Sequence, residues 1–370
     1  MSKPAPAIDR VEATAYRIPT DSPEADGTIA WDSTTIVIAQ VHAGGIVGIG
    51  YTYGHAAIAA LIDSPLRDCL MEHDPEDIPG AWKRMNRALR NMGRPGAGLM
   101  AIAALDHALW DLKARLHEIS VVDLMGAARL SVPVYGSGGF TSYSVERLQE
   151  QLAGWVADGL YMVKMKVGTY PDADAARVHA AREAIGADAS LMVDANGAYT
   201  PRQALAQAMH FADDGVCWYE EPVSSDDLEH LAWLRARLPA TMQLTAGEYG
   251  WDDWYFRRML AAGAVDVLQV DSTRCGGFTG FLRAAALAHA HGVPVSAHCA
   301  PALHAHVCAA LGNVSSIEYF HDHTRIESMC FDGLPELHAG ALVVDRNRHG
   351  LGLQLKAADM AAYEVGGHVG

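Results

Sequence analysis

Short apolar runs alternate with amphipathic segments of helical periodicity through the middle of the chain, at intervals of roughly 25 residues. This alternation is typical of parallel strands joined by helices. Eight such units in about 200 residues predict an α/β fold with a closed (β/α)8 barrel of the TIM type rather than an open doubly wound sheet. No GxGxxG motif follows the first run, which argues against a dinucleotide-binding fold. The predicted strands cover residues 132–138, 162–167, 191–196, 217–222, 243–248, 266–271, 294–298 and 316–320.

The pattern differs on both sides of this region. Residues 8–55 contain β-rich runs divided by glycines, which predicts an antiparallel meander, and helical periodicity follows from about residue 56 and again over 101–116. The tail after residue 331 is again β-like and is expected to return to the first domain. We therefore predict an α+β capping domain (1–128), a barrel (129–335) and a returning C-terminal segment (336–370).

Composition narrows the class of protein. The 370 residues are 50% apolar, enough for a large core, and the formal net charge is −16 without a stripe of Lys and Arg. That charge argues against nucleic acid or an anionic membrane as a partner. Six scattered cysteines form no CxxC pair, the polar N-terminal lead-in (1–10) resembles no export signal, and no apolar run is long enough to span a membrane. We expect a soluble cytoplasmic protein with reduced thiols.

Ionisable residues end every predicted strand from the second onward. In a parallel barrel these ends lie at one face, where catalytic groups of such barrels are found. Charges that merely mark where strands reach solvent would not recur with this regularity. The residues are Lys164, Lys166, Asp194, Glu220, Glu221, Glu248, Asp271, His298 and Glu318.

The stretch "VKMKVG" (163–168) places two of the chain's six lysines on one strand. Residues i and i+2 of a strand share a face, so Lys164 and Lys166 point into the barrel together. Each ammonium group lowers the proton affinity of the other, which favours a neutral base near physiological pH. The alternatives are two lysines that extend to solvent, or a Schiff-base lysine, which leaves the following carboxylates unexplained.

Asp194, Glu220 and Glu248 close three successive strands, so their carboxylates should converge. Crowded like charges need a cation, and oxygen ligands without His or Cys favour Mg²⁺ or Mn²⁺. The alternative is pairing with arginines, and only Arg274 lies near a strand end. Asn196 is expected to orient Asp194 or to bind substrate. The adjacent Glu221 either supports the site or points outward.

Asp271 and His298 close the next two strands and should form a hydrogen-bonded dyad. Such an aspartate fixes the imidazole tautomer and raises its pKa, which suits acid/base catalysis. The dyad would face the lysine pair across the barrel mouth. Glu318, at the last strand, could donate a hydrogen bond if its surroundings keep it protonated. A solvated carboxylate is the alternative.

Taken together, these motifs resemble the mandelate racemase subgroup of the enolase superfamily. The matching segments are "KMK", "VDAN", "EEP", "GE", "VDSTRCGG", "SAH", "IEYF" and the helix "ALDHALWDL", so the resemblance spans essentially the whole chain. It implies an enolase-like barrel with an α+β capping domain, and Mg²⁺-assisted abstraction of the proton α to a carboxylate. It also implies a symmetric homo-oligomer.

The resemblance further implies a role for each residue. Lys166 would be one base and Lys164 would neutralise the substrate carboxylate, while His298 would act on the opposite face and Glu318 would hydrogen-bond the developing enediolate. The resemblance assigns no role to Tyr249 or Cys299.

Substrate choice would be set by capping loops at about 19–32 and 50–55. Their polar residues favour an acid sugar and hence a dehydratase, with Asp21 and Tyr53 as candidate substrate contacts. A racemase or epimerase of a 2-hydroxy acid is the main alternative, cycloisomerase chemistry is another, and a non-catalytic metal-binding scaffold is a remote one. The polar cap residues are Thr20, Asp21, Ser22, Glu24, Asp26, Tyr51, Tyr53 and His55.

Overall fold

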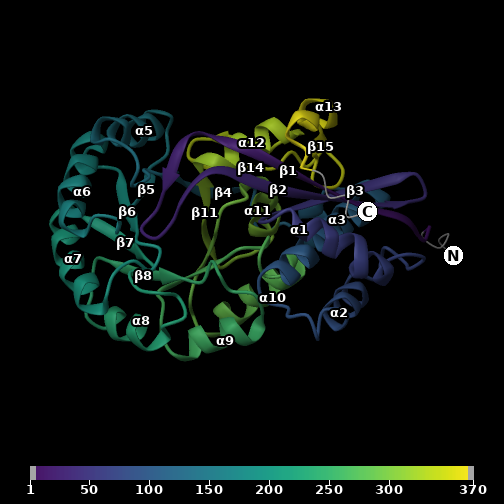
Figure 1. Ribbon diagram of the computed structural model, residues 1–370, viewed down its shortest axis with the longest axis horizontal. Helices are drawn as coiled ribbons and strands as arrows, with labels where there is room; N and C mark the ends of the chain where they lie inside the picture. Colours follow the sequence, from purple (N-terminus) through teal and green to yellow (C-terminus); the bar gives the residue numbers. More distant parts are fainter. Residues whose placement is uncertain (1–5, 366–370) are drawn as a thin grey trace.

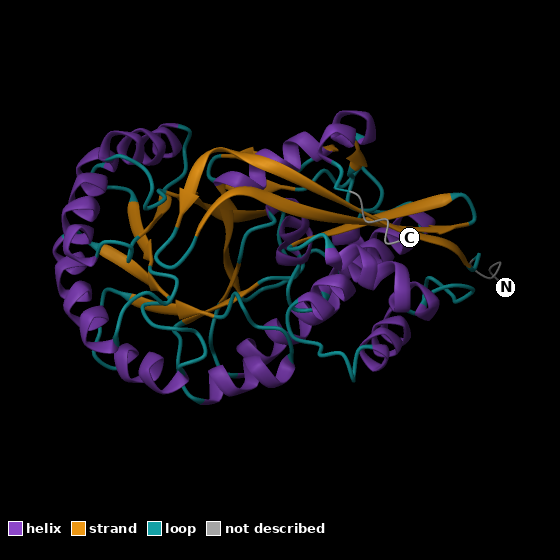
Figure 2. Ribbon diagram, in the orientation of Figure 1, coloured by secondary structure: helices purple, strands orange, loops and turns teal. Residues whose placement is uncertain are grey.

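A computed structural model describes residues 6–365. The predicted N-terminal lead-in and the C-terminal segment therefore lie partly outside the described residues. The described part forms an N-terminal antiparallel sheet with helices beside a barrel (Figures 1 and 2). Within it, no helix combines the length and the apolar character that crossing a membrane requires.

The N-terminal unit is the predicted antiparallel meander packed on helices. Gly50 of its third strand lies against helix α3, where a Cβ atom would come within 2.2 Å of the Ala104 carbonyl oxygen, so only glycine allows this contact. Helical structure after residue 56 is interrupted, partly at Pro65, rather than continuous. The elements are β1 (Ile8–Ala25), β2 (Ala30–Ala43), β3 (Ile46–Tyr53), α1 (Ala57–Leu61), η1 (Ile62–Leu66), η2 (Arg67–Cys69), α2 (Ile78–Ala88), α3 (Ala97–Leu116) and α4 (Val121–Met125).

Eight parallel strands form the barrel, and β11 pairs with β4 to close it. The predicted (β/α)8 fold is thus confirmed. The strands are β4 (Ser131–Gly138), β5 (Met162–Lys166), β6 (Ser190–Asp194), β7 (Val216–Glu220), β8 (Gln243–Ala246), β9 (Val267–Val270), β10 (Val295–Ala297) and β11 (Val314–Phe320). The helices are α5 (Val145–Ala157), α6 (Pro171–Ile185), α7 (Pro201–Asp213), α8 (Leu228–Arg235), α9 (Asp253–Ala261), α10 (Gly277–Ala290), α11 (Pro301–Ala309) and α12 (His321–Cys330).

Alternation along the barrel strands separates apolar packing from the site. Val163, Met165 and Val167 belong to the large apolar core between strands and helices. Lys164 and Lys166 point the other way, and register pairs Lys166 with Asp194 on β6. The strand ends therefore bring the predicted groups to one face of the barrel.

The C-terminal segment contacts both domains. Strand β14 extends the barrel sheet by pairing antiparallel with β4, whereas Glu364 forms a bridge with Tyr16 of β1. The limits 1–128, 129–335 and 336–370 remain a prediction. From residue 331 onward the elements are β12 (Phe331–Asp332), β13 (Glu336–His338), β14 (Ala341–Val343), β15 (Gln354–Leu355), α13 (Ala357–Met360) and η3 (Ala361–Tyr363).

Candidate active site

A cavity of about 330 Å³ lies where the β1–β2 hairpin, the end of β3 and helix α3 face the barrel mouth. Both domains line it, and several of the predicted strand-end residues are among its walls. From the barrel it is lined by Lys166, Asn196, Glu248, Tyr249, Asp271, Thr273, Arg274, His298, Cys299, Phe320 and His323; from the N-terminal domain by Asp26, Ile29, Trp31, Ser33, Thr34, Thr35, Tyr53, Gly54 and Met100.

The hairpin tip is fixed to the barrel by specific contacts. The Asp26 carbonyl oxygen accepts hydrogen bonds from the hydroxyls of Thr141 (2.9 Å) and Thr169 (2.5 Å). Gly27 lies so close that a Cβ atom would come within 2.4 Å of the Ala195 carbonyl oxygen. The tip therefore roofs the cavity beside the end of β6.

The carboxylates of Asp194, Glu220 and Glu248 converge as the sequence predicts. All three residues are buried, and one oxygen of each lies within 4.8 Å of the others. The backbone N–H of Asn196 donates to Asp194 Oδ1 at 2.9 Å, which holds this carboxylate in place. Such an all-oxygen set suits a hard divalent cation.

Unbalanced charge in the site also fits a divalent cation. Burial, followed by the nearby Asp194, raises the pKa of Glu220 to about 8, and Glu220 Oε1 has no hydrogen-bond partner in the described structure. Glu221 is buried rather than pointing outward, and burial and Glu248 raise its pKa well above its usual value. With all six buried carboxyls ionised, as metal binding requires, the site would carry two more negative than positive charges, and a divalent cation would balance them. The six carboxyls are Asp194, Glu220, Glu221, Glu248, Asp271 and Glu318, and the four cationic groups are Lys164, Lys166, Arg274 and His298.

Arg274 is a site residue to which the sequence assigned no function. Its Nη1 lies 3.1 Å from Glu248 Oε1 and its Nε lies 3.6 Å from Asp271 Oδ2, so it joins one carboxylate of the triad to the dyad. Pairing with arginine, the alternative for the triad, is thus realised at Glu248 alone among the three in the described structure. Tyr249 stacks on this guanidinium, with 4.9 Å between Arg274 Cζ and the ring centre.

The lysine pair faces the site, but its pKa values shift in the direction opposite to the prediction. Lys164 Nζ lies 2.5 Å from Glu220 and 2.8 Å from Glu318, and Lys166 pairs with Asp194. Burial lowers the pKa of Lys166, Asp194 raises it, and Lys164 lowers it, with a net rise. The expected mutual effect of the lysines therefore exists but is outweighed by Asp194.

Asp271 and His298 form the predicted dyad. His298 Nδ1 lies 2.9 Å from Asp271 Oδ2, and Asp271 Oδ1 accepts bonds from the backbone N–H and hydroxyl of Thr273, both at 2.7 Å. Burial lowers the pKa of His298, but surrounding anions, including Glu248 at 3.1 Å, raise it well above its usual value. The imidazole is therefore held in one orientation with Nε2 directed toward the carboxylates.

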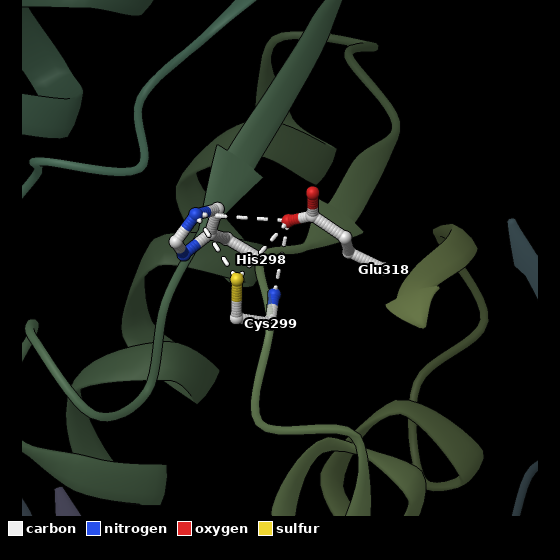
Figure 3. A group of neighbouring side chains, drawn as sticks. All are labelled: His298, Cys299 and Glu318. Atoms are coloured by element: carbon white, nitrogen blue, oxygen red, sulfur yellow. Dashed lines mark hydrogen bonds and ion pairs between the residues drawn. The ribbon is translucent and has the colours of Figure 1, made fainter. Parts of the chain in front are cut away.

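Glu318 is ionised rather than protonated. Burial raises its pKa, but Lys164 and then His298 outweigh burial and lower it below the usual range. Its Oε1 accepts from the Ser137 hydroxyl at 2.5 Å. Its Oε2 accepts from the Cys299 backbone N–H at 3.1 Å (Figure 3). The prediction that Glu318 donates a hydrogen bond is wrong for this arrangement, because Lys164 stabilises the carboxylate.

The predicted substrate contacts are only partly brought together. Tyr53 and Asn196 line the cavity, and neither the Tyr53 hydroxyl nor Asn196 Oδ1 has a hydrogen-bond partner within residues 6–365. Asp21 does not line the cavity, because it lies 3.1 Å from His321 and 3.6 Å from Arg147.

Most polar cap residues that the sequence highlights lie outside the cavity walls. Of the eight, only Asp26 and Tyr53 line it, and the polar cap side chains missed there are Ser33, Thr34 and Thr35. Burial raises the pKa of Glu24 to about 8, and this residue accepts a bond from Trp31 instead. The sequence of β2 has no pattern that distinguishes the side chains on the cavity wall from the other side chains of the strand.

Two family models match the chain. The model described as "Mandelate racemase / muconate lactonizing enzyme, N-terminal domain" covers residues 12–126, and the one described as "Enolase C-terminal domain-like" covers residues 147–359. A solved mandelate racemase/muconate lactonizing enzyme-like protein from Rubrobacter xylanophilus is 50% identical. Its TM-score is 0.95, with 97% of this chain and 100% of that one covered.

Relatives of known activity include a dehydratase and a cycloisomerase. L-talarate/galactarate dehydratase from Salmonella typhimurium, solved with Mg and L-lyxarohydroxamate, is 28% identical. Its TM-score is 0.90, over 98% of this chain and 93% of that one. D-galactarolactone cycloisomerase from Agrobacterium fabrum is 34% identical over 284 residues, 75% of this chain and 74% of that one. Solved relatives thus carry magnesium, in agreement with the oxygen ligands found here.

Proposed function

The chain belongs to the mandelate racemase and muconate lactonizing enzyme family of the enolase superfamily, and on this basis we propose that it is a Mg²⁺-dependent dehydratase of an acid sugar. It would remove the proton α to the substrate carboxylate and eliminate the β-hydroxyl as water, which yields a 2-keto-3-deoxy acid. The observation that carries the proposal is the placement of Lys166 and His298 on the wall of one cavity together with Glu248 of the carboxylate triad. A small polyhydroxy carboxylate is the expected partner.

The metal requirement follows from the carboxylate triad. Asp194, Glu220 and Glu248 would hold Mg²⁺, which when bound supplies positive charge where negative charge develops on the substrate carboxylate. Mn²⁺ suits the same oxygen ligands. Asn196 positions Asp194 through its backbone N–H.

Lys166 is the proposed base for the α-proton. Its Nζ accepts the proton once its ion pair with Asp194 is relieved, because Lys164 then lowers its pKa. Lys164 is fully buried behind the cavity wall, so it would act on the substrate carboxylate through its positive charge rather than by direct contact. Ser137 and Lys164 hold Glu318, so this carboxylate positions the neighbouring donors rather than donating itself.

His298 is the proposed acid for the leaving hydroxyl. Its Nδ1–H is held by Asp271, and its raised pKa keeps a proton available on Nε2. The C–O bond breaks as this proton joins the hydroxyl to form water, and the resulting enol becomes the keto acid. Return of a proton to the α-carbon instead would give a racemase or epimerase with the same groups.

Cycloisomerisation is the second candidate, favoured by the 34% identity with D-galactarolactone cycloisomerase. A non-catalytic metal-binding scaffold would not require an acid and a base, and it therefore does not account for His298 and Lys166.

A substrate screen tests the proposal. We would incubate the protein and Mg²⁺ with mono- and diacid sugars, and in parallel with their lactones, and would detect 2-keto products by semicarbazone absorbance. Turnover of a free acid sugar that is lost in His298→Asn supports dehydration, whereas turnover of lactones alone favours cycloisomerisation. No keto product from either set would contradict the proposal, and α-deuterium uptake without keto product would point to racemisation.

A further inference from the structure

A second cluster of metal-ligating atoms lies beside the carboxylate triad. His298 Nε2, Cys299 Sγ and Glu318 Oε2 form a triangle with sides of 3.3, 3.4 and 3.6 Å, and all three residues are buried (Figure 3). We propose that these three residues form a site for a thiophilic divalent cation of the Zn²⁺ class. Occupation of this site would block His298 and inhibit the enzyme.

The size of the triangle matches tetrahedral zinc. Bonds of about 2.0–2.1 Å to nitrogen, 2.3 Å to sulfur and 2.0–2.2 Å to carboxylate oxygen place ligand atoms about 3.3–3.6 Å apart in a tetrahedron. The three measured sides fall within this range. An ion of this class can therefore be bound with little movement of the side chains.

The thiol is held in place by an unusual backbone conformation. Cys299 and Ala300 have φ angles of 53° and 38°, in the left-handed region that is costly for residues other than glycine. Hydrogen bonds hold this turn: His304 Nδ1 lies 2.7 Å from the Cys299 carbonyl oxygen, and the Ala300 N–H donates to His323 Nδ1 at 3.3 Å. In this turn Sγ is directed toward the imidazole and the carboxylate.

Outer partners orient the other two ligands. Asp271 holds His298 Nδ1, and carboxylate partners of this kind are usual for metal-binding histidines. Nε2 is therefore the ligand atom, and a bound ion would replace its present contact with Glu248 Oε2 at 3.1 Å. Ser137 and Lys164 bind Glu318 Oε1, and Oε2, which accepts from the Cys299 backbone N–H at 3.1 Å, is the oxygen directed to the cluster.

Ligand chemistry separates this site from the triad. Thiolate and imidazole select Zn²⁺ and similar cations, whereas three carboxylates suit Mg²⁺. His298 and Cys299 also line the cavity, so a fourth ligand position faces open space. On binding, a sulfur–metal bond replaces the S–H bond, and the thiol proton, with any proton on Nε2, leaves to solvent.

Cobalt spectroscopy tests the site without any assay of activity. Co²⁺ is added to the full chain in excess Mg²⁺, and absorption is recorded in the region of thiolate-to-cobalt charge transfer and of tetrahedral d–d bands. We expect one Co²⁺ per chain with both features, displaced by Zn²⁺. The charge-transfer band should be absent in Cys299→Ser and kept in Cys308→Ser, a buried thiol on α11.

Affinity measurements sharpen this test. Asp271→Asn should weaken Zn²⁺ binding about 10- to 100-fold, as loss of an outer partner does, and Cys299→Ser should weaken it by more than that. If Cys299→Ser does not fold, His298→Asn serves, since it should remove the tetrahedral bands. Absence of the charge-transfer band in the wild type, or its persistence in a folded Cys299→Ser, would overturn the site.

The inhibitory consequence rests on the proposed function. In the wild type, Zn²⁺ added over saturating Mg²⁺ should stop turnover at the concentration at which the site fills, and a Zn²⁺ anomalous peak should lie between Nε2, Sγ and Oε2. Cobalt binding without inhibition would keep the metal site and overturn only the blocking of His298. If the wild type turns over no acid sugar, that result counts against the proposed function, and the metal site is still tested by the cobalt spectra.

Discussion

Gly27 at the hairpin tip controls how the N-terminal domain covers the cavity, and Gly27→Ala tests this. The new Cβ would lie 2.4 Å from the Ala195 carbonyl oxygen and 2.8 Å from that of Val167, while ordinary contacts begin at 3.4 Å. The tip must therefore move by about 1 Å, because neither backbone oxygen can rotate away. Overpacking of this kind costs about 1–3 kcal/mol.

The expected effect is local opening of the tip. The amides of Thr28 and Ile29 donate to Asp26 Oδ1 at 2.7 and 2.9 Å, and they report on the tip directly. A cost of about 1–3 kcal/mol predicts hydrogen exchange roughly 5- to 150-fold faster at these amides, measured by mass spectrometry. Any acid-sugar turnover should fall by up to about 100-fold, because catalysis tolerates a 1 Å displacement poorly.

The control is Gly154→Ala on α5, where nothing lies within 4 Å of the added Cβ. It should leave exchange at the tip unchanged. Equal exchange in Gly27→Ala and the wild type would refute the close approach of the tip to the barrel.

Three further changes probe metal, pH and substrate contacts. Asp194→Asn should abolish Mg²⁺ binding in calorimetry while Asp21→Asn, at an exposed ion pair outside the cavity, keeps it; equal affinities would contradict the triad. Burial raises the pKa of Glu327 to about 8 in the folded chain, so its contribution to stability is full below about pH 4.5 and is lost as pH rises toward 8. In urea unfolding, the free energy of unfolding of the wild type should fall relative to that of Glu327→Gln as pH rises from about 4.5 to 8, by at most about 1.4 kcal/mol per pH unit. A difference between the two proteins that stays constant over this pH range would contradict the prediction. Tyr53→Phe should lower kcat/KM roughly 3- to 10-fold without loss of stability, since its hydroxyl has no partner among residues 6–365, whereas Tyr51→Phe should destabilise because Tyr51 donates to Glu327.

The sequence was sufficient for the barrel and for the residues at its strand ends. Parallel strands bring their carboxyl ends to one face, so a residue's position at a strand end also gives its place in space. For this reason Asp194, Glu220 and Glu248 could be grouped, and Asp271 paired with His298, before any distance was known.

Features that depend on contacts between distant segments were not predictable in this way. The pKa of Lys166 is set mainly by burial and Asp194, and Lys164 keeps Glu318 ionised, whereas the neighbouring residues in the sequence predict the opposite in both cases. The cap residues that face the cavity depend on how the hairpin docks, so the sequence alone does not show that Thr34 lines the cavity and that Asp21 does not. Arg274 lies in the loop between β9 and α10, and the periodicity of the sequence does not predict where a loop side chain points.

Solvent exchange at the substrate α-carbon tests the central claim most directly. With Mg²⁺ and a responsive acid sugar in D₂O, we expect the wild type to form keto product. His298→Asn should exchange the α-proton without forming product, because Lys166 still works, and Lys166→Ala should do neither. Full turnover by Lys166→Ala, or loss of exchange in His298→Asn with Lys166 intact, would contradict the assignment of Lys166 as base and His298 as acid.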